Sequence, residues 1–100
     1  MLVHLSAGVY PLLRLLGESA LTVELTIDFE HDVRKSAIAF PGAAEEGLGF
    51  ERVKVDGLDV WWRQRLLLGL REPAVTTRVR PRRLRVATVG RALSATAEYA

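Results

Sequence analysis

The feature that most constrains the fold is a nine-residue segment in which apolar and polar residues alternate without a break. In Leu21–Phe29, every second side chain is apolar, and Thr22, Glu24, Thr26 and Asp28 lie between them. Side chains of a strand point to alternate faces, so a period of two predicts a β-strand with one buried and one polar face. The predicted buried face consists of Leu21, Val23, Leu25, Ile27 and Phe29.

Shorter segments of the same kind predict several more strands. Asp56-Gly57 lies between two such segments and is a typical hairpin turn. Leu58–Leu70 fits two structures: its Leu, Gln and Arg content favours a helix, whereas its alternation and the preceding turn slightly favour a strand. The other predicted strands are Ser36–Phe40, Phe50–Val55, Ala74–Arg80, Leu84–Val89 and, as a last strand or frayed tail, Arg91–Tyr99; Leu2–Leu5 is a short strand or an unstructured lead.

One helix is predicted near the N-terminus, between Pro11 and Gly17. Proline fits the first turn of a helix, and glycine often follows the last. Together these elements predict a single domain over residues 1–100 with an α+β fold. We expect a mostly antiparallel sheet of five to seven short strands, with one or two short helices covering the apolar face of Leu21–Phe29. An all-β sandwich or barrel is the alternative.

Charge is divided unevenly along the chain. Residues 1–60 hold five Lys/Arg against ten Asp/Glu, a net charge of −5, whereas residues 61–100 hold nine Arg against two Glu, a net of +7. Arg78–Arg85 (RVRPRRLR) has five arginines in eight residues. Such an asymmetry indicates an interaction surface, or two regions that neutralise each other.

We interpret Arg78–Arg85 as a hairpin that turns at Pro81. The outward face of this hairpin would carry Arg78, Arg80, Arg83 and Arg85. Like charges opposite each other in a sheet are unfavourable, so a partner is expected. The outer face of Leu21–Phe29 supplies a complementary acidic face, which comprises Glu24, Asp28 and, just beyond the strand, Glu30.

A pair of adjacent tryptophans, Trp61-Trp62, is the second candidate feature, and Arg63 and Arg65 follow it closely. Neighbouring residues of a strand point to opposite faces, so one ring is expected in the core and the other under a covering group. Trp and Arg are enriched at protein interfaces. Trp61, Arg63 and Arg65 are therefore added to the predicted interaction face.

Motifs for catalysis are weak. The chain has no cysteine, which excludes disulfides, thiolate metal sites and cysteine nucleophiles. Glu30-His31-Asp32 combines groups that bind metals or transfer protons, but consecutive residues rarely converge on one ion and a solvated turn is the expected structure. No serine has a G-x-S-x-G context, and the glycines of Gly42–Gly49 lack the Lys-Ser/Thr of a phosphate-binding loop.

The sequence therefore predicts a non-enzymatic module for protein–protein interaction or assembly. We expect self-association through charge-complementary faces, and nucleic-acid binding by the Arg78–Arg85 hairpin is the alternative. No cofactor, metal, membrane or small-molecule partner is predicted. The lack of cysteine and of an apolar run of roughly 18 residues leads us to expect a cytoplasmic protein.

Overall fold

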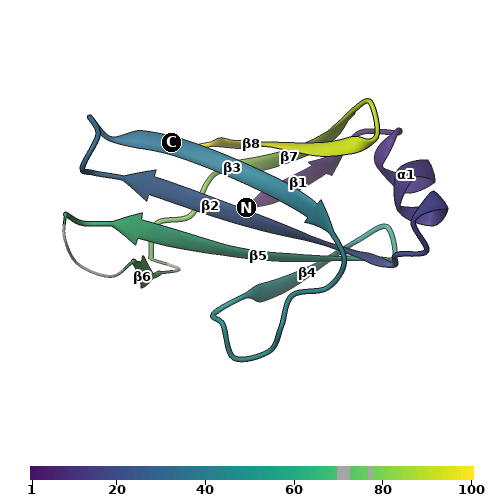
Figure 1. The fold of residues 1–100 in the computed structure, drawn as a ribbon, viewed down its shortest axis with the longest axis horizontal. Helices are drawn as coiled ribbons and strands as arrows, with labels where there is room; N and C mark the ends of the chain where they lie inside the picture. The colour runs from purple at the N-terminus through teal and green to yellow at the C-terminus, as the bar shows by residue number, and fades with distance from the viewer. Residues whose placement is uncertain (70–72, 77) are drawn as a thin grey trace.

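The computed structural model describes residues 1–69, 73–76 and 78–100. These residues are mostly β-strand, with one short helix (Figure 1). The elements, in chain order, are β1 (Leu2–Leu5), α1 (Val9–Leu15), β2 (Ala20–Asp28), β3 (Arg34–Pro41), β4 (Glu51–Val55), β5 (Leu58–Leu67), β6 (Ala74–Val75), β7 (Arg83–Val89) and β8 (Ala92–Glu98).

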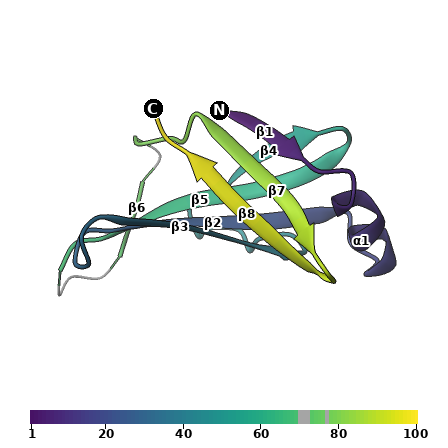
Figure 2. The ribbon, with the colours of Figure 1, turned by 90° about the horizontal axis from the view of Figure 1, so that it is seen from above.

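The strands form two sheets that face each other. The larger has the order β3-β2-β5-β4, with β6 beside β5, and the smaller has the order β1-β7-β8. Strands of the smaller sheet run obliquely over those of the larger one (Figure 2). A β-rich α+β fold was predicted and is present, and four of the six strand pairs in the described residues are antiparallel, but the strands form two mixed sheets where one sheet was expected. The two layers are instead a feature of the sandwich alternative.

Both sheets contain a parallel pair, and the chain path explains why. After β3 the chain crosses the outer face of the larger sheet and enters β4 at its far edge, so β5 runs parallel to β2. Two contacts fix this crossing. The hydroxyl of Thr22 donates to the Gly42 carbonyl at 2.8 Å, and the guanidinium of Arg63 donates to the Leu48 carbonyl, also at 2.8 Å. β1 likewise runs parallel to β7.

The core lies between the two sheets. Val23 and Leu25 of β2 belong to one buried cluster with Leu84 and Val86 of β7. Helices were predicted to cover this face, but the smaller sheet lies over it, and α1, which packs against β7 at one end of the molecule, adds only Val9 and Leu13 to the same cluster (Figure 1). The predicted core residue Phe29 lies beyond the end of β2 and is 49% exposed.

Two predictions from local sequence are confirmed: the hairpin turn at Asp56-Gly57 and the strand interpretation of Leu58–Leu70, as far as Leu67. Asp56 and Gly57 both have positive φ, 49° and 80°, which two-residue turns of type I′ require, and they join β4 to β5. The Leu58–Leu70 segment is a strand, β5, as far as Leu67. Leu70 lies outside the described residues.

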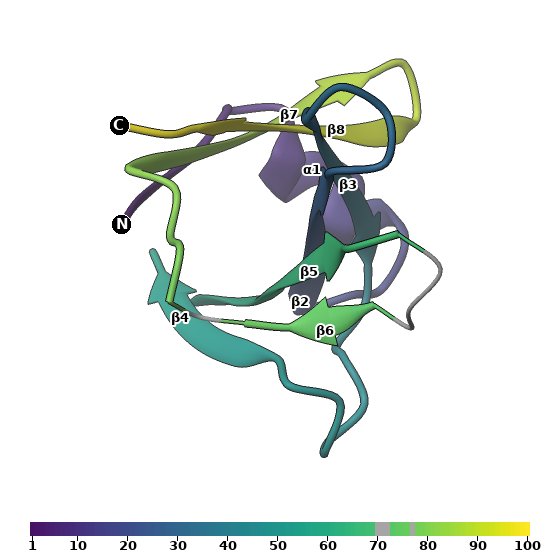
Figure 3. The same cartoon turned by 90° about the vertical axis from the view of Figure 1, so that its left-hand side faces the viewer.

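Arg78–Arg85 is not a hairpin, which corrects the prediction. Its first residues lie in no strand, and its last three begin β7, which pairs with β1 and β8. The predicted strand Ala74–Arg80 is reduced to β6, and Thr77 within it lies outside the described residues. The segment connects the two sheets along one side of the molecule (Figure 3). Pro81 is fully buried there.

Candidate interaction surfaces

An ion cluster occupies the outer face of the larger sheet. A carboxylate oxygen of Glu24 on β2 accepts hydrogen bonds from Arg63 at 3.0 Å and from Arg65 at 3.1 Å. The register aligns Glu24 with Arg63, and Arg65 lies two residues further along the same face of β5. The side chains of Glu24 and Arg63 are 14% and 17% exposed. Three residues predicted for two opposing interaction faces therefore bind one another within the chain.

The two tryptophans point to opposite faces of β5, as predicted. Trp62 is 1% exposed and belongs to the core, and the guanidinium of Arg80 lies 5.5 Å from its ring centroid. Trp61 is half-buried on the outer face, where Arg52 of β4 lies 5.5 Å from its ring. Arginine covers both rings, so neither is an open stacking platform.

We define the cationic face as the outer surface of the smaller sheet around Arg82, Arg83 and Arg85. All three lie within 4.0 Å of the same carboxylate, that of Glu98 on β8, at 3.9, 3.9 and 3.4 Å. The parallel register places His4 of β1 beside Arg85 on this face. Three guanidinium groups thus share one carboxylate, and the face keeps an excess of positive charge.

A shallow pocket of about 360 Å³ lies on this face. It is lined by Leu2, Val3, His4, Arg83 and Arg85. The side chain of Leu2 is 66% exposed, so the pocket offers apolar surface between cationic groups. Such a surface suits a partner that combines apolar and acidic side chains.

The turn between β2 and β3 has that combination. We define the acidic tip as residues 28–33, which carry the carboxylates Asp28, Glu30 and Asp32. Phe29 and Val33 are 49% and 52% exposed, although both are large and apolar. Val33 also has a φ of 51°, a left-handed conformation that β-branched residues rarely adopt.

Within the tip, His31 bonds to a carboxylate. Its Nδ1 lies 2.8 Å from Asp28, and Asp28 also accepts a hydrogen bond from the backbone N–H of Glu30 at 2.8 Å. Single ligand atoms of Asp28, Glu30 and His31 all lie within 4.8 Å of one another. Asp32 of the sequence motif is not in this group. All three residues belong to the same exposed turn, and the described residues around them add no further metal ligand, so the group does not indicate a metal site.

This contact gives a prediction for the titration of His31. The hydrogen bond to Asp28 raises the pKa of His31 and lowers the pKa of Asp28. The pKa of His31 is higher in the folded state than in the unfolded state. The contribution of His31 to stability is therefore fully present below its unfolded-state pKa and is lost as the pH rises through its folded-state pKa. The effect of Asp28 is lost as pH falls through its lowered pKa. By NMR titration, the pKa of His31 should lie above that of an unperturbed histidine, and Asp28→Asn should lower it toward that value. An unchanged His31 pKa in that variant would contradict the contact.

Among the described residues, the arginines of Arg78–Arg85 form no ion pair with the predicted acidic residues Glu24, Asp28 and Glu30. Arg80 pairs with Glu51 of β4 at 2.9 Å, and Arg83 and Arg85 approach Glu98. The backbone N–H of Arg78 donates to Thr76. Charge neutralisation inside the chain is therefore extensive, but it uses carboxylates other than Asp28 and Glu30.

Several residues of these surfaces escaped sequence reasoning. Glu51 and Glu98 are isolated carboxylates in predicted strands, and only the strand order places them beside arginines. Leu2 and His4 join the cationic face because β1 pairs with β7, about 80 residues away in the chain. The exposure of Phe29 has no signal in the sequence, since it continues the alternation of the strand.

Comparisons with protein-family models, curated proteins and solved structures found no match to this chain. In the described part of the chain, no helix has the length and hydropathy that crossing a bilayer requires.

Proposed function

We propose that this protein is a non-catalytic assembly module that self-associates head to tail. The acidic tip of one copy docks on the cationic face of the next. The observation that carries the proposal is the sharing of the Glu98 carboxylate by Arg82, Arg83 and Arg85, which leaves that face with a net positive charge.

Complementarity supports the tip as the occupant. The tip offers Glu30 and Asp32, both exposed and in no ion pair with the described part of the chain, together with the exposed Phe29 and Val33. The cationic face offers arginines around the apolar pocket at Leu2. Opposite charges steer association and fix orientation, whereas buried apolar contacts supply much of the affinity.

Geometry supports a contact between copies. The cationic face points away from the larger sheet, and the tip belongs to that larger sheet. Two different patches meet, so the contact is heterologous, and such contacts build rings or open chains.

Charge reversal tests the proposal. Arg82→Glu/Arg85→Glu reverses the two most exposed arginines of the face, and Glu30→Lys/Asp32→Asn removes the net negative charge of the tip while keeping a residue that tolerates the φ of 56° at position 32. By analytical ultracentrifugation at low salt, we expect wild type to form oligomers and each variant alone to be monomeric. An equimolar mixture should form a heterodimer, because the unaltered tip of the first variant then meets the unaltered cationic face of the second.

The control is Arg91→Glu, which reverses an exposed charge in the turn between β7 and β8 and should leave association unchanged. A monomeric wild type at high concentration in both low and high salt would refute self-assembly. The nucleic-acid alternative makes a different prediction. Salt-sensitive binding of duplex DNA or RNA, lost in Arg82→Glu/Arg85→Glu, by a protein that stays monomeric would assign the face to phosphates.

A further inference from the structure

A second cationic pocket lies where Arg78, Val79 and Arg80 pass the C-terminal ends of β2 and β8. It has a volume of about 390 Å³, and its lining includes Ile27, Lys35, Arg78, Arg80 and Tyr99. It shares no residue with the cationic face or the acidic tip. Its volume falls in the range of roughly 300–1,000 Å³ that is typical of small-molecule sites.

The charged side chains that line this pocket have one sign. Lys35, Arg78 and Arg80 all line it, and the described lining residues include no Asp or Glu. Arg80 also binds Glu51, outside the pocket, at 2.9 Å. Three cationic side chains around one concave site attract an anion, and low-dielectric walls strengthen that attraction.

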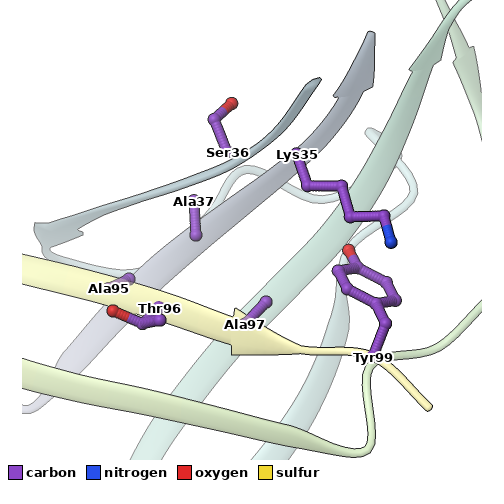
Figure 4. A pocket seen from close by; sticks show the side chains of 7 residues that line it. All are labelled: Lys35, Ser36, Ala37, Ala95, Thr96, Ala97 and Tyr99. Atoms are coloured by element: carbon purple, nitrogen blue, oxygen red, sulfur yellow. The ribbon is translucent and has the colours of Figure 1, made fainter. Parts of the chain in front are cut away.

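The same pocket has an apolar and aromatic side. Ile27 and Val79 contribute apolar surface, and the ring of Tyr99 contributes an aromatic one. Figure 4 shows the side chain of Lys35 reaching toward this ring, and its Nζ lies 4.8 Å from the ring centroid. Lys35 and Tyr99 also border a small hollow of about 130 Å³, whose lining includes three alanines, a serine and a threonine.

One buried side chain fixes two walls of the pocket. Gln64 is fully buried, and its amide oxygen accepts a hydrogen bond from the Tyr99 hydroxyl at 2.5 Å. Its amide nitrogen donates to the carbonyl of Val79. Burial also raises the pKa of Tyr99, which further favours the protonated hydroxyl that donates this hydrogen bond. The pocket is therefore held in shape before any ligand arrives, which lowers the entropic cost of binding.

We propose that this pocket binds a small amphipathic anion, a compact apolar or aromatic body that carries one phosphate or carboxylate group. The anionic group lies among Lys35, Arg78 and Arg80, and the body lies against Ile27 and the ring of Tyr99. This assignment gives a role to Gln64, a polar residue in the otherwise apolar face of β5.

Four probes test the proposal by NMR titration of the full chain: phenyl phosphate, benzoate, inorganic phosphate and benzyl alcohol. We expect phenyl phosphate or benzoate to bind at least tenfold more tightly than inorganic phosphate and benzyl alcohol, because only they combine charge with a ring. The shifts should centre on Lys35 and Tyr99. Removing one charged hydrogen-bond donor should weaken binding about tenfold or more, so Arg78→Ala and Lys35→Met should each have that effect.

Arg91→Ala is the matched control, since Arg91 lies at the other end of β8 and should leave binding unchanged. Arg78 is exposed, so its truncation should not disturb folding, and an unaltered backbone spectrum checks this. Equal affinity for phenyl phosphate, inorganic phosphate and benzyl alcohol would overturn the proposal. Shifts confined to the cationic face, or full binding by Arg78→Ala, would overturn it too.

Discussion

Trp62→Ala is expected to lower the free energy of unfolding by about 3–5 kcal/mol, as large-to-small changes of buried aromatic residues do. The ring is 1% exposed and belongs to the cluster that joins both sheets. Its loss leaves a cavity beneath Arg80, whose guanidinium lies over the ring. A domain of this size is stable by only about 5–15 kcal/mol, so the variant should unfold at a much lower urea concentration.

Trp61→Ala is the matched control, because it removes the same side chain from the opposite face of the same strand. Trp61 is half-buried and contacts Arg52, so about 1 kcal/mol is expected. Urea unfolding of both variants gives the comparison. A larger loss for Trp61→Ala would show that β5 presents the other face to the core, and equal losses would contradict the difference in burial between the two rings.

Local sequence patterns predicted much of the secondary structure because they report on short-range physics. The alternation in Leu21–Phe29 fixes which face of β2 is buried, and Asp56-Gly57 supplies the positive φ values that the β4–β5 turn needs. The alternation of side chains along a strand also predicted that Trp61 and Trp62 point to opposite faces of the sheet. Each of these inferences depends on residues within about ten positions of one another.

Strand order depends on contacts that local patterns do not encode. Nothing in the sequence of Leu2–Leu5 indicates a parallel partner in Arg83–Val89. Likewise, nothing in the loop between β3 and β4 indicates that it crosses the sheet to the far side of β5. For the same reason the sequence did not indicate which charged residues pair with one another. Arg63 meets Glu24 because β2 and β5 are neighbours, and the arginines of β7 meet Glu98 because β8 follows them.

In Arg78–Arg85, Pro81 explains why the predicted pairing of two strands does not form. Alternating arginines on both sides of Pro81 indicated two paired strands. Proline lacks the N–H that a ladder needs, and here it is buried between the sheets as the chain passes from one to the other. The backbone N–H of Arg82 instead donates to the Glu98 carbonyl at 2.6 Å, which starts the pairing of β7 with β8.

Glu24→Gln is expected to lower the free energy of unfolding by about 2–3 kcal/mol, somewhat less than the loss of one partner costs in a fully buried pair. The change removes the carboxylate that binds both Arg63 and Arg65. It leaves two like charges on the same face of β5, and Arg63 is only 17% exposed, so water compensates poorly. Arg65 is 35% exposed, and solvent screening reduces its share. Urea unfolding measures the loss.

Glu51→Gln provides the matched comparison, because Glu51 also binds an arginine, at 2.9 Å, but the side chains of Arg80 and Glu51 are 51% and 38% exposed. A surface pair of this kind contributes less than about 1 kcal/mol. Added salt should reduce the small effect of Glu51→Gln further and change the effect of Glu24→Gln little, since half-buried charges are weakly screened. If the two variants lost equal stability, or if salt abolished the Glu24 effect, the cluster would be a solvated surface pair. A large, salt-resistant loss would establish that the acidic residue of β2 and the arginines of β5 hold the larger sheet together and are not free to bind a partner.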